Sequence, residues 1–370
     1  MQTLGVFPDV HLEYQNANSM QRLKNLVSTP TVKLQDVAER LGVSIATVSR
    51  ALAGSDLISS TTREAVQVAA AEIGYRLPTQ GRKVRKSATR LVGVVVGALH
   101  NQFMTRLLEH LHDALQEAGY QVTLLIDSMS DPQSLQAFRP LIDGYLDGMI
   151  FATATLDSPV VRELKRRGIP VVLVVRSVDD AGTDTVEIDN VQAGAEAARH
   201  LVDLGHRDIG LVMGPENTST SRDRVAGALQ CLERAGIPNE RVPLVWGDYT
   251  TESGYSGALQ LLQQPAPVTA IAAGNDTIAF GVLEAAKRNG VSVPGQLSVI
   301  GFDDSPIAGS PLIGLTTICQ PVEALARTAA RRLVEKMHSG RLGTTTHDIL
   351  PVQLIRRETT GAPLLNKRAS

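Results

Sequence analysis

Predicted helices that end at a glycine alternate with short apolar runs through most of this 370-residue chain. The expected helix ends are Gly119, Gly168, Gly236 and Gly290, and each is followed by an apolar run. Such runs are typical of strands buried on both faces, and repeated strand–helix–strand units build parallel sheets. Two series, about residues 90–188 and 189–318, predict two doubly wound α/β lobes. Ligands of such folds bind at the carboxyl ends of the strands, which places a binding cleft between the lobes.

Missing motifs exclude several classes of function. The chain contains no GxGxxG, GxxxxGK or GxSxG, so dinucleotide, Walker-type and nucleophile-elbow sites are not supported. No uncharged apolar stretch approaches the length of about 18 residues that spans a membrane, and the first 30 residues do not form a secretory signal. Cys231 and Cys319 match no metal-ligand spacing. We therefore expect a cytoplasmic protein without a metal or cofactor.

Charge is divided unevenly along the chain, although the net charge is only −2. Residues 1–89 carry 11 Lys and Arg against 7 Asp and Glu, whereas the remainder carries 25 against 31. The strongest basic run is Arg82-Lys83-Val84-Arg85-Lys86, which on its own fits a solvated linker as well as a contact with a polyanion. A basic head on an acidic body indicates that only the head meets nucleic acid.

The basic head contains three predicted helices. Apolar residues recur at helical spacing over residues 34–41, and Gly42 ends that helix. Ser44 can cap a second helix that runs to about residue 52, and a third helix starts at residue 59 or 60 and runs to 73. Two short helices joined by a glycine-containing turn, with a third packed on them, indicate a helix-turn-helix unit. An ordinary three-helix bundle has the same pattern.

The outer face of the second helix carries residues that can read DNA. Val48 and Leu52 are expected in the core, which leaves small side chains outward on a helix that can enter the major groove. The hydroxyls of Thr47 and Ser49 suit phosphate oxygens, and Arg50 suits a guanine edge or a phosphate.

The segment DVAERLGVSIATVSRAL, followed by STTREAV and IGY, resembles the DNA-binding head of the LacI/GalR (lactose-repressor/galactose-repressor) family. The resemblance implies a homodimer that binds near-palindromic operator DNA and inserts a hinge side chain into the minor groove. Val84 stands here where the family has leucine. The family's major-groove readers fall at Ile45, Ala46 and Arg50, of which the first two can touch only thymine methyl groups. The expected DNA-binding residues are Leu34, Ser44, Ile45, Ala46, Thr47, Ser49, Arg50, Thr62, Arg82, Lys83 and Val84.

The body is similar to the same family, whose fold is that of periplasmic sugar-binding proteins with three crossovers between the lobes. The matching segments are Asp189-Asn190, HLVDLGHRDIGLVMGP, SRDRVAGAL, AAGNDTIAFGVLEAAKRNGVSVPGQLSVIGFDDS, LTTICQP and RRET. The expected divisions are a disordered leader at 1–30, a helix-turn-helix domain at 31–76, a hinge at 77–89, a first lobe at 90–188 and 320–348, a second lobe at 189–318 and 349–361, and a tail at 362–370.

The family's effector site carries over to seven positions of this chain. Arg224 matches an arginine that clamps ligand hydroxyls or a carboxylate, and Asn275 and Asp303 match residues that hydrogen-bond sugar hydroxyls. Where the family often has an acid before an arginine, this chain has Val175-Arg176, which makes the pocket more cationic. We therefore expect a small-molecule effector that is a sugar, a sugar acid or a sugar phosphate. The expected effector-binding residues are Asn101, Phe103, Arg176, Arg224, Asn275, Asp303 and Gln320.

Two other classes of protein fit the body less well. A periplasmic binding protein would need an export signal and no helix-turn-helix, and a sugar-processing enzyme would need a catalytic constellation in the cleft. Asp303 and Asp304 form a candidate acid/base pair, but adjacent residues at a strand end point opposite ways. Asp304 is expected instead to cap the turn at Ser305, and Asp276 either caps the helix after Asn275 or touches the ligand. We predict a transcriptional repressor, not an enzyme, with the direction of the effector's action on DNA binding left open.

Overall fold

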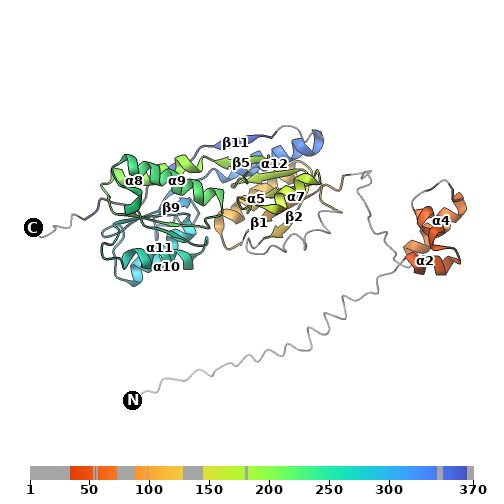
Figure 1. Ribbon diagram of the computed structural model, residues 1–370, viewed down its shortest axis with the longest axis horizontal. Coiled ribbons are helices and arrows are strands. Elements are labelled where there is room, and N and C mark those ends of the chain that lie inside the picture. Colours follow the sequence, from red (N-terminus) through yellow and green to blue (C-terminus); the bar gives the residue numbers. More distant parts are fainter. Residues whose placement is uncertain are drawn as a thin grey trace, which may run out of the picture. The chain divides into compact units, whose positions relative to one another are not determined.

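The computed structural model describes residues 34–52, 55, 57–72, 88–97, 99–127, 145–179, 182–339 and 345–364 (Figure 1). The expected leader, the hinge residues Arg82, Lys83 and Val84, and the chain beyond 364 lie outside these ranges. The chain divides into two units, residues 1–84 and 85–370. No helix in the described ranges is long and apolar enough to cross a membrane.

The first unit is a bundle of three helices around a small apolar core. The helices are α2 (Leu34–Leu41), α3 (Ile45–Leu52) and α4 (Ser60–Glu72). Each contributes a fully buried valine, and the three are Val37, Val48 and Val66. The helical periodicity of the sequence therefore predicts the correct packing faces.

The turn between α2 and α3 follows from two residues. Gly42 has a φ of 63°, a left-handed conformation that glycine adopts without a steric penalty. Ser44 Oγ then accepts a hydrogen bond from the Thr47 N–H at 3.1 Å and so caps α3. One expected core position is wrong in detail, because Leu52 is half-buried and Ala51 is the fully buried residue of this turn of α3.

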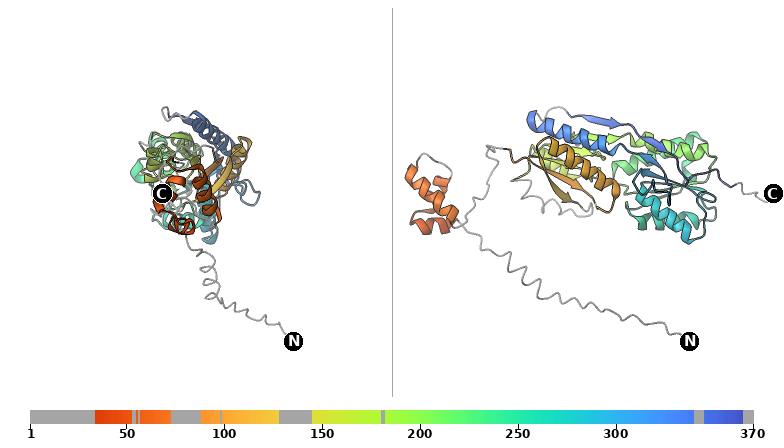
Figure 2. Two further views of the ribbon diagram at one scale, coloured as in Figure 1. Left: turned by 90° about the vertical axis from the view of Figure 1, so that its right-hand side faces the viewer. Right: turned by 180° about the vertical axis from the view of Figure 1, so that it is seen from behind.

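The first lobe of the second unit is a six-stranded parallel sheet in the order β11-β5-β4-β3-β1-β2. Helices α5 and α12 pack side by side on one face (Figure 2, orange and blue). Helix α7 packs on the other face. The elements are β1 (Leu91–Val96), α5 (Gln102–Glu117), β2 (Gln121–Ile126), β3 (Gly148–Phe151), α7 (Pro159–Arg166), β4 (Val171–Val174), β5 (Asp184–Ile188), α12 (Val322–Ser339) and β11 (His347–Leu350).

The second lobe repeats this plan in the order β12-β10-β9-β8-β6-β7, with only β12 antiparallel to its neighbour. Helices α8 and α9 pack together on one face, and α10 and α11 on the other. The elements are α8 (Asn190–Asp203), β6 (Ile209–Met213), α9 (Ser219–Arg234), a 3-10 turn (Asn239–Arg241), β7 (Leu244–Trp246), α10 (Thr251–Leu262), β8 (Ala270–Ala273), α11 (Asp276–Arg288), β9 (Ser298–Asp303), β10 (Thr316–Cys319) and β12 (Gln353–Ile355).

Reciprocal glycine contacts hold each helix pair of the second lobe together. A Cβ atom added to Gly194 of α8 would lie 2.1 Å from the carbonyl oxygen of Arg224 in α9, and one added to Gly227 of α9 would lie 1.8 Å from a carbonyl oxygen of α8. Gly254 and Gly281 make the same kind of contact between α10 and α11, each at 2.0 Å. Within each pair, the two backbones touch with no side chain between them.

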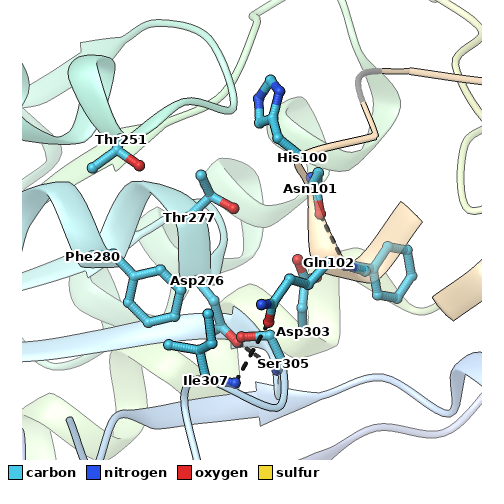
Figure 3. A pocket seen from close by; sticks show the side chains of 11 residues that line it. His100, Asn101, Gln102, Thr251, Asp276, Thr277, Phe280, Asp303, Ser305 and Ile307 are labelled. Atoms are coloured by element: carbon cyan, nitrogen blue, oxygen red, sulfur yellow. Dashed lines mark hydrogen bonds between the residues drawn. The ribbon is translucent and has the colours of Figure 1, made fainter. Parts of the chain in front are cut away.

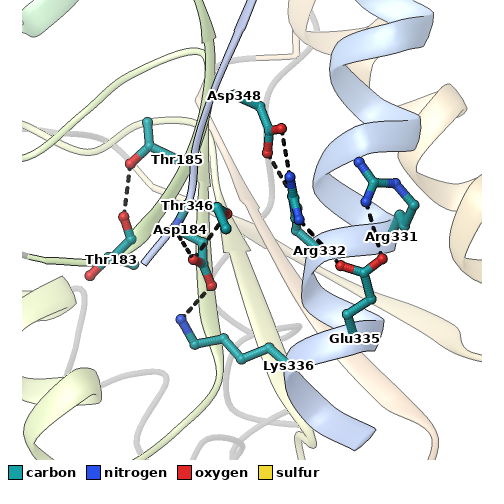
Figure 4. Close-up of polar contacts among 9 residues, drawn as sticks. All are labelled: Thr183, Asp184, Thr185, Arg331, Arg332, Glu335, Lys336, Thr346 and Asp348. Carbon is teal, nitrogen blue, oxygen red and sulfur yellow. Dashed lines mark hydrogen bonds and ion pairs between the residues drawn. The ribbon is translucent and has the colours of Figure 1, made fainter. Parts of the chain in front are cut away.

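The chain crosses between the lobes after β5, after β10 and after β11. The last strand of the first lobe runs to Leu350, beyond the expected boundary at 348. Two ion pairs tie α12 to this end of the sheet (Figure 4): Lys336 Nζ lies 2.5 Å from Asp184 Oδ2, and Arg332 donates two hydrogen bonds of 2.7 Å to Asp348. These contacts fix the returning segment against β5.

Candidate functional site

The predicted DNA-reading face of α3 is exposed. Ile45, at the first position of the helix, has 48% of its surface exposed, and Ala46, Ser49 and Arg50 are exposed as well. Ile45 and Ala46 present only carbon on this face, whereas Arg50 presents a forked donor that matches a guanine edge. The face suits a major groove and has no packing role within the bundle.

Hydroxyl groups at the helix starts are engaged in capping. Ser44 Oγ lies 2.8 Å from Thr47 Oγ1, and Ser59 Oγ lies 2.8 Å from Thr62 Oγ1. Leu34 is half-buried and packs against the core of the head. These residues support the helices whether or not they also touch DNA, and their contact with DNA stays a prediction.

All seven predicted effector residues line one cavity between the lobes, which we call the inner chamber. The first lobe contributes residues from the start of α5 and the end of β4, and the second lobe contributes residues from α9 and the ends of β8 and β9. The space open to a water-sized sphere is only about 30 Å³, so the lining side chains lie close together. The lining residues are Asn101, Phe103, Met104, Val175, Arg176, Thr220, Arg224, Tyr249, Asn275, Asp303 and Gln320.

Arg224 is held in the inner chamber by neutral partners. The residue is 3% exposed, its Nε donates to Asn190 Oδ1 at 3.0 Å, and its Nη1 donates to the Gly274 carbonyl oxygen at 2.7 Å. Its guanidinium carbon lies 4.0 Å from the centroid of the Phe302 ring. These contacts orient the charge without neutralising it.

A second buried guanidinium, that of Arg176, adds to this positive charge. Arg176 is 4% exposed and lies over the Tyr249 ring, 5.4 Å from its centroid. Burial lowers the pKa of Arg176 from its usual value. Burial also opposes ionisation of Tyr249, but the neighbouring Arg176 and Arg224 outweigh it and lower the pKa of the phenol. The inner chamber therefore favours groups that carry negative charge.

Asp303 does not cancel that charge at neutral pH. Burial, together with the nearby carboxyl of Asp276, raises the pKa of Asp303 to about 8, so most of it is protonated at pH 7. Gln320 Nε2 donates to Asp303 Oδ1 at 2.6 Å. Asp303 also has a φ of 114°, which L-residues rarely adopt and which is often found at functional sites.

The two predicted asparagines have a structural role in addition to their place in the chamber. Asn101 Oδ1 accepts a hydrogen bond from the Phe103 N–H at 3.0 Å and caps α5. Asn275 Oδ1 accepts one from the Ile278 N–H at 2.9 Å and caps α11. Each side-chain oxygen already accepts one hydrogen bond, and the amide NH₂ groups are the donors that these residues can offer a ligand.

The expected capping roles of two aspartates are wrong, although Asp276 lines the outer chamber and its contact with a ligand stays a prediction. Asp304 does not cap the turn at Ser305, because it pairs with Arg357 at 2.6 Å. Asp276 does not cap α11, because its carboxylate accepts hydrogen bonds of 2.7 Å from the Ser305 N–H and from Thr317 Oγ1. Asp276 therefore fixes the segment after β9 to the start of α11, and burial raises its pKa to about 6.

Tyr249 is the main lining residue that sequence reasoning missed. Its hydroxyl lies 2.7 Å from Ser221 Oγ and 2.9 Å from Thr220 Oγ1, which holds the ring in the inner chamber. Tyr249 follows β7 closely, so it lies at the carboxyl end of a strand in a parallel sheet. The rule that places ligands at such ends could have identified it.

A second and larger cavity of about 210 Å³, the outer chamber, shares Asn101, Phe103 and Asp303 with the inner chamber (Figure 3). Its other lining residues are His100, Gln102, Thr251, Asp276, Thr277, Phe280, Ser305 and Ile307. Among the residues that the structure describes, no group of three or more His, Cys, Asp or Glu side chains could hold a metal ion.

Comparison with known proteins gives matches to both units. A family model described as bacterial regulatory proteins, lacI family, matches residues 33–77, and one described as periplasmic binding proteins and sugar binding domain of LacI family matches residues 89–358. The transcriptional repressor CytR of Escherichia coli strain K12 is 34% identical over 330 residues, which cover 89% of this chain and 96% of CytR. The transcriptional regulator DegA of Bacillus subtilis strain 168 is 31% identical and covers 88% of this chain and 97% of DegA.

Two solved structures of transcriptional regulators also match the chain over both units. The complex of the transcriptional regulator CelR with cellobiose is 29% identical, with a TM-score of 0.68, and covers 89% of this chain and 99% of that one. The lac repressor dimer bound to operator and the anti-inducer ONPF is 28% identical, with a TM-score of 0.65, and covers 90% of this chain and 99% of that one.

Proposed function

Because the chain belongs to the LacI family of bacterial regulatory proteins, we propose that it represses transcription in the cytoplasm by binding operator DNA under the control of an effector held between its lobes. Its relatives are transcriptional regulators rather than enzymes. The head is a DNA-binding domain of the family, and the body is a sugar-binding domain of the family.

Operator binding uses the exposed face of α3. Arg50 contacts a base edge in the major groove, while Ile45 and Ala46 contact thymine methyl groups. A homodimer presents two such helices to a near-palindromic site, as expected when half-sites mirror a two-fold axis. The lac repressor, a structural neighbour, is a dimer on its operator.

The effector binds in the inner chamber and carries an acidic group. Structural neighbours contain cellobiose or ribose, which supports a sugar. Arg176 and Arg224 both line the chamber, while the carboxyl of Asp303 is largely neutral at pH 7. Val175 stands where the family often has an acid, so nothing at that position offsets Arg176. A sugar acid or sugar phosphate matches this charge.

The convergence of all seven predicted residues on one cavity is the observation that carries the proposal. The test begins by selecting duplexes that the full-length protein retains from a random pool. Sugars, sugar acids and sugar phosphates are then screened by thermal unfolding, where a ligand at 100 times its Kd adds about 2.7 kcal/mol of stability. A hit must change operator affinity by the same factor as operator changes its own affinity. Failure to enrich any sequence would refute the regulator, and a hit without this coupling would refute effector control.

A further inference from the structure

The outer chamber is a ring-sized space that the proposed contacts of the effector do not fill. Its walls come from both lobes, with the His100–Phe103 segment facing the starts of α10 and α11 and the segment after β9 (Figure 3). The Ile307 N–H donates to Gln102 Oε1 at 3.5 Å and bridges the lobes along one wall. Its volume of about 210 Å³ compares with about 30 Å³ for the inner chamber.

One buried oxygen atom on the inner chamber lacks a hydrogen-bond partner among the described residues, whereas the buried serine of the outer chamber has one. Ser305, which lines the outer chamber, is 5% exposed, and its side chain and backbone N–H both hydrogen-bond Asp276. Gln320, which lines the inner chamber, is 3% exposed, and its Oε1 has no such partner. Buried polar groups are nearly always hydrogen-bonded, so an unpaired one points to a missing partner. A hydroxyl group of a ligand in the inner chamber would supply that hydrogen bond to Gln320 Oε1.

The two chambers differ in charge. Arg176 and Arg224 line the inner chamber, whereas the outer chamber has no Lys or Arg among its lining residues. It offers instead the carboxyl of Asp276 and the hydroxyls of Thr251 and Thr277 beside the half-buried ring of Phe280. Hydroxyl groups next to an apolar surface suit an uncharged sugar ring, which has polar edges and a face of C–H groups.

Asp303 lies where the two chambers meet, since it lines both. Its carboxyl is largely protonated at pH 7, because burial and the nearby Asp276 raise its pKa to about 8. A protonated carboxyl can donate a hydrogen bond to an ether oxygen, which an ionised one cannot do. The boundary between the chambers therefore suits the oxygen that links two sugar rings.

We infer that the outer chamber is a second sugar subsite, so that the effector is a disaccharide or longer glycoside. Its acidic unit lies at Arg176 and Arg224, and its uncharged second ring lies against Phe280, Thr277 and Ser305. The inference rests on the proposed function, because it takes the acidic unit of the inner chamber as given.

The test compares single-ring and two-ring probes on the full-length protein by calorimetric titration. The probes are D-glucuronic acid and D-galacturonic acid, disaccharides of each with a neutral hexose, and cellobiose as a neutral disaccharide. We expect an acidic disaccharide to bind at least 10-fold more tightly than its own uronic acid. The inference is wrong if the uronic acids bind as tightly as the acidic disaccharides, or if no disaccharide binds.

Two variants test the location of the second ring. Thr277→Trp fills the outer chamber and should erase the difference in affinity between the acidic disaccharide and its uronic acid. Ser256→Trp, at an exposed position of α10 outside both chambers, is the matched control and should keep it. Equal affinities of the disaccharide for Thr277→Trp and Ser256→Trp would overturn the assignment.

The outcomes separate this inference from the function on which it rests. Tighter binding of cellobiose than of any acidic disaccharide would refute the proposal that the effector is acidic, but it would support the second sugar subsite. If the protein retains the selected duplexes but binds disaccharides no more tightly than single-ring sugars, the regulator is supported and the second sugar subsite is refuted.

Discussion

Asp303→Asn should flatten the pH dependence of stability between pH 6 and pH 8. Burial, together with the nearby carboxyl of Asp276, raises the pKa of Asp303 in the folded protein to about 8, whereas the ordinary value is 3.8. Between these values the folded protein keeps a proton on Asp303 that the unfolded chain has lost. The stability that the protonated Asp303 contributes to the folded protein is thus fully present below pH 3.8 and is lost as pH rises through 8.

The size of the effect follows from one proton. A difference of one bound proton changes the free energy of unfolding by about 1.4 kcal/mol per pH unit. The native protein should therefore lose about 2–3 kcal/mol between pH 6 and pH 8 through this residue alone. Asp276 titrates lower, near a pKa of about 6, so it contributes mainly below this window. Arg224 and Arg106 favour the ionised form of Asp303 and partly offset the rise in its pKa.

The measurement is urea unfolding at pH 6, 7 and 8 for the native protein and for Asp303→Asn, since asparagine keeps the shape and cannot titrate. Asp248→Asn, at an exposed position, is the control for loss of a carboxylate. The free energy of unfolding should fall less steeply with pH for Asp303→Asn than for the native protein. For Asp248→Asn it should fall as steeply as for the native protein. Parallel curves for all three proteins would show that Asp303 is ionised in the folded state and would remove its role as a neutral donor.

Three further predictions concern the head, the inner chamber and the second lobe. Arg50→Ala should weaken a selected operator by about 1–3 kcal/mol and relax its sequence preference; unchanged affinity in a mobility-shift titration would mean that α3 does not read the bases. Arg176→Ala should weaken binding of a sugar acid far more than binding of its neutral analogue, and equal losses by calorimetry would count against an acidic effector. Gly227→Ala would place a methyl group 1.8 Å from a backbone oxygen of α8 and should lower stability by at least about 1–3 kcal/mol in urea unfolding. Gly361→Ala, whose methyl meets only ordinary contacts, should be nearly neutral, and similar losses for both variants would refute the packing argument.

Much of the fold could be predicted because its signals are local. The helical spacing of apolar residues around Val37 and Val48, with Gly42 between them, is enough to predict the helix-turn-helix of the head. Glycine stops followed by β-branched runs predict the parallel strands for the same reason. The end of β11 at Leu350 escaped prediction because it depends on pairing with β5, which is distant in sequence. Pairing between distant segments leaves no periodic trace in either one.

The site could be predicted only as far as the family's positions and strand ends indicate. Asn275 before a helix fits both a cap and a ligand contact, and the structure places it in both situations. The partners of Asp276 and Asp304 cannot be read from the sequence, because Ser305 and Arg357 approach them only through the tertiary fold. The outer chamber has no sequence signal, since its walls come from segments of both lobes that meet only after folding.

The glycine contacts within the helix pairs bear on how such a regulator could be retargeted in the laboratory. Asn190 and Arg224 lie on one helix pair, and Thr251 and Thr277 lie on the other. These side chains are therefore carried on helices whose backbones leave no room for a methyl group between them. A mutagenesis library that exchanges side chains on these helices changes the chemistry of the wall on a fixed backbone, but one that replaces the glycines lowers the stability of that backbone packing. Changes of effector shape should come more readily from the segment before α5, whose partner is the opposite lobe rather than a neighbouring backbone.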